Sequence, residues 1–400
     1  MPALLAKAPD TSSEKRRWRL LRYRPEVAPA LAALLGAVAF VTARLLILGH
    51  GDISVFVDAG PFFTDPHPHL LLQRDPGFGF DGQFSYRLAL DPSDLQPYGH
   101  GVRLDSALRE QRILYPTLVW LVSLGGKAYL VPTALVVVNV FAVVAIAAAG
   151  GRLAREAGRR PIWGLLLAAP WCYLLTIGRD LHEAVAGAFL AWAIVALRRQ
   201  RRVVAAGLLT CGVLTRESVL IFALTVFSVD AVHVWRRHAR PEAGDLIGLL
   251  PISVFVSWQI VCWRANGAFP AQSGSGANFG VPAEGLAQAV TKWFSTSGLA
   301  VDRGAQFLLL VVLTLSVVPL LRRTSIASTY ERTAWVAYVG YVLCQSMIVW
   351  YDAGELRATS DLQLLSAVFA LSGPSRQRRG YAGLAALGWM MTAVRRASQV

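Results

Sequence analysis

The stretch from Phe80 to Pro92, FDGQFSYRLALDP, holds the residues best suited to chemistry. An acid directly before a glycine can occupy a tight turn, which leaves the Asp81 carboxylate free to act as a base. Tyr86 and Arg87 on the following helical turn can contact a sugar ring or a phosphate, and we place Gln83 in the same substrate-binding group. The alternative is structural, with Asp81 as the N-cap of a surface helix.

Two other turns combine arginine with acids beside apolar runs. They are Arg216-Glu217 and Arg179-Asp180, the latter followed by Glu183. Ionisable groups at such positions are costly unless they are paired or lie in a hydrated cavity. Two interpretations stay open: mutually neutralising ion pairs that hold a helix hairpin, or the wall of a cavity that binds an anion or a polar substrate.

Several common site motifs are absent. Gly77 to Gly82 fits the GxGxxG spacing, but it does not follow a strand of a βαβ unit, so the dinucleotide-binding interpretation is discarded. The sequence has no Walker A, GxSxG or zincin pattern. Its four cysteines lie in or beside apolar runs without a CxxC pair, which supports neither a disulfide framework nor a zinc site.

A divalent metal stays possible, and no other cofactor is indicated. His67 and His69 with Asp65 form only a weak metal-binding pattern in a proline-rich loop. Acidic residues could supply oxygen ligands, although their spacing does not show that they converge. These residues are Asp58, Asp65, Asp75 and Asp81.

The elements that position these residues are apolar. Hydrophobic residues make up 54% of the chain and charged residues only 16%, with a mean hydropathy of +0.46. A soluble protein of this length needs more charge to cover its surface. The apolar residues cluster in runs of roughly 15–22, the length that crosses a hydrocarbon core. We therefore expect an all-α, polytopic transmembrane bundle.

Basic residues give this bundle an orientation. Lys and Arg exceed Asp and Glu by 39 to 25, and they occur in short clusters between apolar runs, which indicates topology rather than nucleic-acid binding. Placing every basic cluster in the cytoplasm gives about ten spans. They are expected at 28–48, 128–149, 161–178, 183–198, 203–215, 217–234, 245–264, 303–321, 333–350 and 359–373.

Two large external loops follow from this orientation. Residues 49–127 form the first, which has room for helices of its own, and residues 265–302 form the second. The apolar segment Ile113–Leu124 is too short for a span, so we expect an interfacial or re-entrant helix on the external face.

The remaining parts of the chain are assigned to the cytoplasm. Residues 1–27 form a basic tail before the transmembrane domain, 28–373, so the N-terminus is cytoplasmic. Residues 374–400 form a second tail, in which Tyr381–Val394 lies on the cytoplasmic surface. By elimination, the ionisable residues near the membrane collect on the external side. They are Asp81, Arg87, Arg112, Arg179, Asp180, Glu183, Arg216, Glu217, Asp352, Glu355 and Arg357.

FDGQFSYRLALDP resembles the first external loop of GT-C-type membrane glycosyltransferases, in particular a bacterial family tied to cell-surface glycopolymer formation. Three more stretches match that family in order: QRILYP at 111–116, RDLHE at 179–183 and LTRE at 214–217. The resemblance covers about residues 28–235. Ser85 replaces a common aromatic residue, and Ala184 stands where the family often has proline.

This resemblance implies a glycosyltransferase of the bacterial inner membrane, with Asp81 as general base. The donor would be a polyprenyl-phosphate-linked sugar, since nucleotide sugars are not available outside that membrane. The acceptor would be a glycan or lipid of the envelope, and the anomeric carbon would be inverted. An arginine would stabilise the leaving phosphate. The candidates are Arg216 and Arg357, then Arg112. Tyr86 and Arg87 would orient the sugar or the loop, and Tyr115 belongs to the same substrate-binding set.

Two other function classes stay open. A transporter or flippase for a lipid-linked glycan precursor would use inverted repeats, broken helices and charges at mid-membrane. No convincing inverted repeat is visible, and the charges lie towards one side. A non-catalytic scaffold of an envelope assembly complex would tolerate neutral residues at Asp81 and Arg216.

Overall fold

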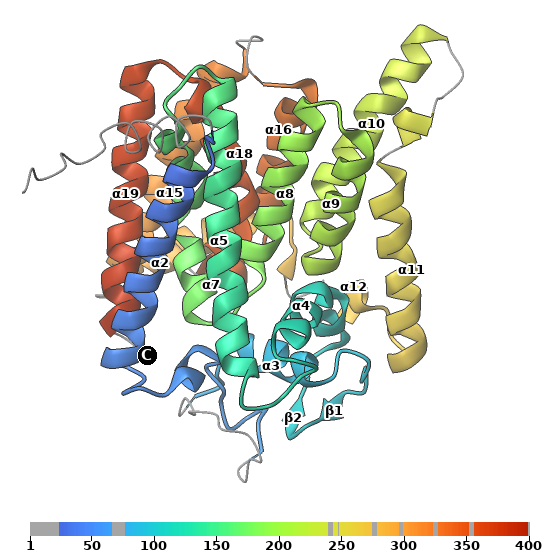
Figure 1. The fold of residues 1–400 in the computed structure, drawn as a ribbon, viewed down its shortest axis with the longest axis vertical. Helices are drawn as coiled ribbons and strands as arrows, with labels where there is room; N and C mark the ends of the chain where they lie inside the picture. The colour runs from blue at the N-terminus through green and yellow to red at the C-terminus, as the bar shows by residue number, and fades with distance from the viewer. Residues whose placement is uncertain are drawn as a thin grey trace, which may run out of the picture.

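The apolar runs form long helices that pack side by side (Figure 1). The computed structural model describes residues 24–65, 77–238, 243–246, 248–273, 278–295, 299–322, 327–351 and 356–398. The prediction of a helical fold is confirmed. The helices of the bundle are α2 Val27–Ile47, α5 Val131–Glu156, α6 Leu165–Ala168, α7 Cys172–Gly178, α8 Glu183–Arg198, α9 Arg202–Thr215, α10 Val219–Arg237, α11 Leu249–Asn266, α15 Leu299–Leu321, α16 Thr329–Leu343, α18 Ser360–Ser372 and α19 Ser375–Ser398.

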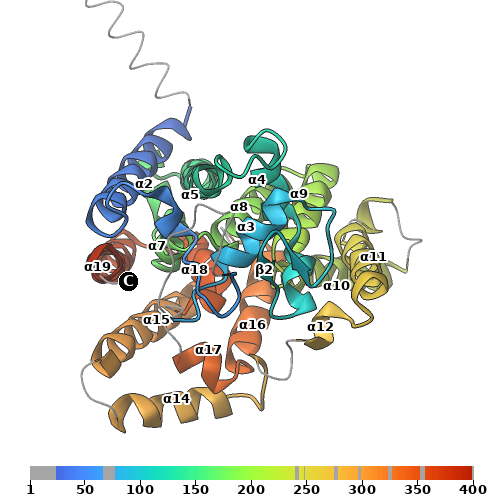
Figure 2. The ribbon, with the colours of Figure 1, turned by 90° about the horizontal axis from the view of Figure 1, so that it is seen from below.

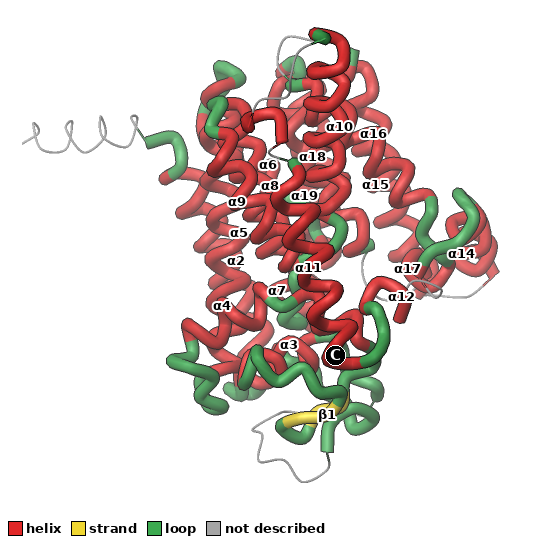
Figure 3. Tube along the Cα trace, turned by 90° about the vertical axis from the view of Figure 1, so that its right-hand side faces the viewer, coloured by secondary structure: helices red, strands yellow, loops and turns green. Residues whose placement is uncertain are grey.

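Shorter elements gather at one end of these helices, which we call the loop end (Figure 3). Seen along the bundle, α3 lies across its middle (Figure 2). Most of these elements come from the first predicted loop, and the short strands pair antiparallel, with Tyr98 opposite Arg103. The elements are the 3-10 helix η1 Ile53–Phe56, α3 Gly82–Leu90, β1 Tyr98–Gly99, β2 Val102–Arg103, the 3-10 helix η2 Ala107–Arg112 and α4 Leu114–Val122.

The number of membrane spans differs from the prediction. Within the ranges given above, four helices are long and apolar enough to cross a membrane: α2, α5, α10 and the part of α15 from Arg303 to Leu321. A fifth candidate is the pair Pro161–Ala168 and Cys172–Gly178, which is bent by 68°. The chain is thus a multi-pass membrane protein with four or five candidate spans, and the predicted ten spans are not reached. The predicted spans 183–198, 203–215 and 359–373 coincide with α8, α9 and α18, which have only 16, 14 and 13 residues.

The predicted span 333–350 is broken. It is divided between α16 and the short α17, Met347–Tyr351. The chain from Asn278 to Ala283 runs beside the break and satisfies its backbone: Gly280 N–H donates to the Cys344 carbonyl, and Ser346 N–H donates to the Asn278 carbonyl, both at 2.9 Å. The second predicted loop also contains two helices, α12 Pro270–Ser273 and α14 Glu284–Ser295, one on each side of this segment.

The opposite end of the bundle, the basic end, holds arginines of the predicted clusters that the structure describes, among them Arg152, Arg198 and Arg199. Ion pairs join neighbouring helix ends there. Arg198 binds both carboxylate oxygens of Glu331 at 2.7 Å, and Arg199 contacts Glu156 at 3.1 Å. Arg152 also pairs with Glu26. Their meeting at one end is what the positive-inside pattern predicts.

The C-terminal helix corrects the prediction for residues 374–400. α19 has 24 residues and packs against α2, α7, α15 and α18, so Tyr381–Val394 does not lie on the end of the bundle. The helix runs along α2 towards the loop end, where the Arg396 carbonyl accepts a hydrogen bond from Arg44 Nη1 at 2.8 Å. The arginines near both ends of α19 lower its mean hydropathy, so the sequence did not indicate a helix whose small residues pack against neighbouring helices.

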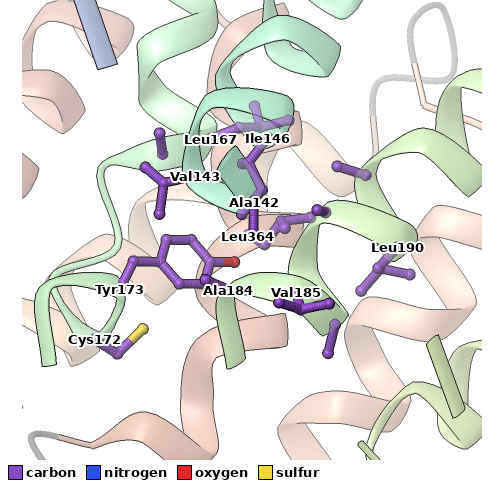
Figure 4. Close-up of a cluster of buried hydrophobic side chains, with 14 of the residues drawn as sticks. Ala142, Val143, Ile146, Leu167, Cys172, Tyr173, Ala184, Val185, Leu190 and Leu364 are labelled. Atoms are coloured by element: carbon purple, nitrogen blue, oxygen red, sulfur yellow. The ribbon is translucent and has the colours of Figure 1, made fainter. Parts of the chain in front are cut away.

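The centre of the bundle is tightly packed around α7 and α8. Figure 4 shows Tyr173 of α7 beside Val143 and Ile146 of α5 and near Ala184 at the start of α8. A Cβ at Gly187 would collide with the Tyr173 hydroxyl, so this glycine permits the close approach of α8 to α7. Dense packing of this kind fixes the start of α8, which carries a site residue.

Candidate functional site

Asp81 lies directly before α3, but its side chain does not cap that helix. Gly82 permits this placement, since a Cβ there would lie 2.5 Å from the Arg179 carbonyl oxygen and 2.6 Å from that of Val57. The Asp81 carboxylate is instead 2.8 Å from Arg109 Nη1 and 2.8 Å from Arg357 Nη2. The capping interpretation is therefore wrong, and Asp81 joins the first loop to the distant 3-10 helix η5, Arg357–Thr359.

The charge state of Asp81 follows from these contacts. Asp81 is only 8% exposed, and burial alone would raise its pKa. The guanidinium groups of Arg109 and Arg357, with Arg112 further away, outweigh burial and hold the pKa of Asp81 well below its usual range. The carboxylate is ionised, and it gives up a proton more readily than it takes one in this arrangement.

Glu183 forms a second meeting point of arginines. It is the first residue of α8, where the helix dipole favours a negative charge, and Thr176 Oγ1 donates to it at 3.3 Å. Its carboxylate lies 3.8 Å from Arg216 Nη2 and 4.0 Å from Arg357 Nε. Arg357 therefore bridges Asp81 and Glu183.

The Arg216-Glu217 turn does not form the mutual ion pair that the sequence allowed. Arg216 leaves α9 in an extended conformation and, besides Glu183, contacts Ser360 Oγ at 2.7 Å. Glu217 instead binds Arg112 through two hydrogen bonds, at 2.9 and 2.5 Å. Each residue of the turn is thus tied to a different element, and the turn is one wall of a site.

These groups surround a cavity of about 390 Å³ at the loop end. Its polar side carries Arg112, Glu183, Arg216, Glu217 and Arg357. Its other side is mostly apolar and comes from α10, α11 and α17, and the chain beside the α16–α17 break contributes two amide side chains. These residues are Leu220, Ile221, Leu224, Phe255, Ile348, Val349, Asn278 and Gln345. Asp81 does not line the cavity itself but meets it through Arg357.

The first loop is also anchored to α11 beside this cavity. Glu110 is buried, its carboxylate accepts from Asn266 Nδ2, and its carbonyl accepts from Trp258 Nε1 at 3.1 Å. Burial raises the pKa of Glu110 to about 7, even though the Asn266 hydrogen bond and Arg87 oppose the shift. Gln259 Nε2 adds a 2.8 Å hydrogen bond to Gln111 Oε1, so η2 and its arginines are fixed in place.

Three predicted substrate-binding residues support the loop instead of lining the cavity. Gln83 Oε1 accepts from Thr64 Oγ1 at 3.1 Å and from Gly60 N–H at 3.3 Å. Arg87 is buried and donates to the Gln96 carbonyl, and Tyr86 is buried beside it in α3. These contacts stabilise the conformation of the loop, which explains why these residue types occur here without the need for a bound ligand.

Three more predicted residues lie deeper, away from the cavity lining. Tyr115 donates to the Leu135 carbonyl at 3.2 Å. Arg179 pairs with Asp58 at 3.0 Å and lies over the Phe80 ring, with its guanidinium carbon 4.3 Å from the centroid. Asp180 is buried in a left-handed conformation. Arg179 nevertheless helps to position the chain beside Asp81 through that ring.

Sequence reasoning missed other members of the site. Arg109 pairs with Asp81, and Ser360 hydrogen-bonds to Arg216, yet neither belongs to a matched motif. The signal for Arg109 was its position one helical turn before Arg112. Nothing in the local sequence marked Ser360, since its partner lies 144 residues away.

The proposed metal ligands are dispersed. Within the described ranges, no group of three or more His, Cys, Asp or Glu side chains is placed to hold a metal ion. Asp58 pairs with Arg179, Asp65 accepts from Tyr98 Oη at 2.5 Å, and Asp81 binds two arginines. The residues predicted as metal ligands or external charges at positions His67, His69, Asp75, Asp352 and Glu355 lie outside the described residues.

Comparisons with protein-family models, curated proteins and solved structures find no match to this chain. The GT-C resemblance therefore stays a prediction, and the geometry of the site carries the functional argument.

Proposed function

We propose that this chain is an inverting membrane glycosyltransferase that moves a sugar from a polyprenyl-phosphate donor to an envelope glycan or lipid acceptor. The observation that carries the proposal is the meeting of Arg112, Arg216 and Arg357 with three carboxylates at a cavity that is polar on one side and apolar on the other. A lipid-linked sugar phosphate has the same division between polar and apolar parts.

The polar side supports phosphate binding. Arg216 is buried, and its Nε has no hydrogen-bond partner among the described residues. Its nearest carboxylate, on Glu183, is 3.8 Å away, which is longer than a direct charge-assisted hydrogen bond. A phosphate between Arg216 and Arg357 would supply the missing acceptors.

The apolar side supports a bound isoprenoid chain. Leu220, Ile221 and Leu224 lie on one face of α10, because residues three and four apart on a helix are neighbours. Phe255 of α11 adds to the same wall, and Leu224 remains 43% exposed at its edge. An apolar chain could therefore pass from the reaction centre towards the lipid between these helices.

Arg357 gives Asp81 a way to become a base only when the donor is bound. Without a ligand, Arg357 contacts the Asp81 carboxylate and helps keep its pKa low. A donor phosphate would compete for Arg357 and raise the pKa of Asp81, because an opposite charge favours the ionised form. The freed carboxylate would then be a better proton acceptor at the moment when the sugar is present.

The reaction follows from these roles. Asp81 takes the proton of the acceptor hydroxyl, and the acceptor oxygen attacks the anomeric carbon on the face opposite the phosphate. The new glycosidic bond forms as the bond between that carbon and the phosphate oxygen breaks. The electron pair leaves with the polyprenyl phosphate, whose charge Arg216 and Arg357 stabilise.

The proposal includes a topology. Chemistry at the loop end, with the arginine clusters in the cytoplasm, places the cavity on the external face of a bacterial inner membrane. The short helices α8, α9 and α18 would then cross a thinned or protein-lined part of the bilayer, as predicted for residues 183–198, 203–215 and 359–373. Labelling of single cysteines in intact cells would test it: positions in 93–100 should react, and positions in 199–201 should not.

The direct test of the base is Asp81→Asn in purified protein, with a panel of polyprenyl-phosphate-linked hexoses and pentoses. We expect release of polyprenyl phosphate to fall by about 10²–10⁴-fold, the usual contribution of a general base. Asp91→Asn is the matched control, because Asp91 lies at the other end of α3 and its carboxylate accepts hydrogen bonds from nearby Ser93 and from the backbone N–H of Asp94. Full activity in Asp81→Asn would reject the mechanism.

A flippase for a lipid-linked glycan is the second candidate. The bent pair α6–α7 and the break between α16 and α17 are the kinds of interruption that transporters use. Proteoliposomes without any acceptor separate the two functions. A flippase would move the lipid-linked sugar between leaflets, whereas the transferase would leave the donor where it was inserted.

A further inference from the structure

A second cavity, of about 480 Å³, lies apart from the candidate site. Its lining comes from α2, the 3-10 helix η3 (Pro161–Gly164), α6, α7 and α19, with Val143 of α5, and shares no residue with the first cavity. In Figure 2, α2 and α19 lie on the side of the bundle opposite α10 and α11. The two cavities therefore face different parts of the surrounding lipid.

The second cavity is shaped for an apolar chain. Small residues line it on both outer helices, with Ala33 and Gly36 on α2 and Ala382 and Ala386 on α19. Large apolar side chains beside it are exposed, including Leu35 at 71% and Leu387 at 44%. A cavity bordered by exposed apolar groups on a membrane protein opens towards lipid tails.

Two arginines lie at the basic end of this cavity. Arg378 is one helical turn before the lining residue Ala382, and its guanidinium carbon is 4.8 Å from the ring centroid of Trp163, which also lines the cavity. Arg378 is only 6% exposed. Arg159 lies just before η3 and approaches the same place.

Neither arginine has a carboxylate partner in the part of the chain that the structure describes. Arg159 Nη2 and Arg378 Nη1 both donate to one acceptor, the Gly373 carbonyl, at 3.3 and 3.0 Å. The Nε atoms of both are buried without hydrogen-bond partners among the described residues. Arg152, Arg198 and Arg199 at the same end each pair with an acid, whereas Arg159 and Arg378 share one backbone carbonyl.

We propose that this second cavity binds an anionic phospholipid, with an acyl chain between α2 and α19 and the phosphate at Arg159 and Arg378. Basic groups between transmembrane helices on the cytoplasmic side recognise anionic headgroups in this way. The lipid would fill the gap between α19 and α2 and supply the missing negative charge. Because the second cavity is separate, the proposal does not depend on the transferase function.

The test is thermal unfolding of the purified full chain in detergent, followed by tryptophan fluorescence, with added dioleoylphosphatidylglycerol or dioleoylphosphatidylcholine. We expect only the anionic lipid to raise the melting temperature. Arg378→Gln should raise the half-saturating concentration of the anionic lipid roughly fivefold, which is the effect of losing one arginine beside an anionic headgroup. Arg376→Gln is the control, because Arg376 is exposed on the same helix.

A second pair of variants tests the chain-binding part. Ala386→Phe fills the second cavity from an exposed position and should abolish the effect of the anionic lipid, whereas Leu387→Phe, next to it but outside the lining, should not. Equal stabilisation by both lipids, or an unchanged response in Arg378→Gln and Ala386→Phe, would overturn the proposal. A stabilisation by polyprenyl phosphate that exceeds that by phosphatidylglycerol and is abolished by Ala386→Phe would do so too, because it would make the second cavity the donor site.

Discussion

The two ends of the bundle use the same residue types in different ways. At the basic end, Arg199 pairs with Glu156 one to one, and the side chains are 35% and 29% exposed. At the loop end, the Asp81 carboxylate contacts both Arg109 and Arg357, and Arg357 lines a cavity. A carboxylate that is shared between arginines can release one of them to a ligand at little cost. A carboxylate with a single partner holds two helices together.

The largest expected difference between the ends is in activity. Arg357→Gln or Arg216→Gln should lower transfer from the lipid-linked donor by about 10²–10³-fold, the effect of losing one group that stabilises transition-state charge. Arg199→Gln, at the basic end, should leave transfer within about twofold, because its exposed ion pair contributes little. Assays of polyprenyl phosphate release would show both. Equal losses at the two ends would break the comparison.

A stability measurement tests the comparison between the two ends in a second way. Arg112→Gln leaves Glu217 without its two hydrogen bonds and should destabilise the protein by roughly 3 kcal/mol, because an unpaired, mostly buried charge is costly. The double variant Arg112→Gln/Glu217→Gln should recover most of that loss. Denaturation in mixed micelles would measure both. A double variant as unstable as the single one would show that the charge of Glu217 is not the cause.

The pH dependence of the loop end provides a smaller effect. Because the pKa of Glu110 is raised to about 7 in the folded protein, its carboxyl group holds its proton to a higher pH there than in the unfolded chain. The stability that this group contributes is present below its ordinary pKa and is lost as pH rises through about 7. The melting temperature should therefore fall from about pH 5 to about pH 8.5, and Glu110→Gln should flatten that decline. An identical pH profile in the variant would contradict the assignment.

The smallest effect belongs to the exposed pair at the basic end. Arg199→Gln should change the free energy of unfolding by no more than about 1 kcal/mol, the usual value of an exposed ion pair. The same denaturation experiment measures it beside Arg112→Gln. A loss as large as that of Arg112→Gln would show that burial and sharing do not separate the two ends.

The hydrophobic pattern predicted where helices form better than how many cross a membrane. The predicted span 28–48 is α2 to within one residue, because its apolar run is long and uninterrupted. Among the described helices, four or five rather than ten are long and apolar enough to cross a membrane, because short helices and long spans have similar composition and length alone separates them. α19 was missed because its flanking arginines lie close to a small-residue face, and only the partner helix shows that this face is buried.

The sequence indicated some of the residues that line the cavity, but not which residues they contact. Arg216, Glu217 and Glu183 do lie together, as their positions beside apolar runs suggested. Which acid each arginine contacts depends on elements far apart in the chain, as for Arg357 and Asp81, 276 residues apart. Conversely, Gln83 and Arg87 belong to a chemically suggestive motif, yet they hold the loop in shape.

The central claim is that a donor phosphate takes Arg357 away from Asp81. The most direct measurement is an experimental structure of the full chain with polyprenyl phosphate bound. The account predicts a phosphate between Arg216 and Arg357, its isoprenoid chain along Leu220 and Leu224, and an Asp81 carboxylate no longer in contact with Arg357. A phosphate bound elsewhere, or an Asp81–Arg357 contact that stays at 2.8 Å with the phosphate in place, would contradict it.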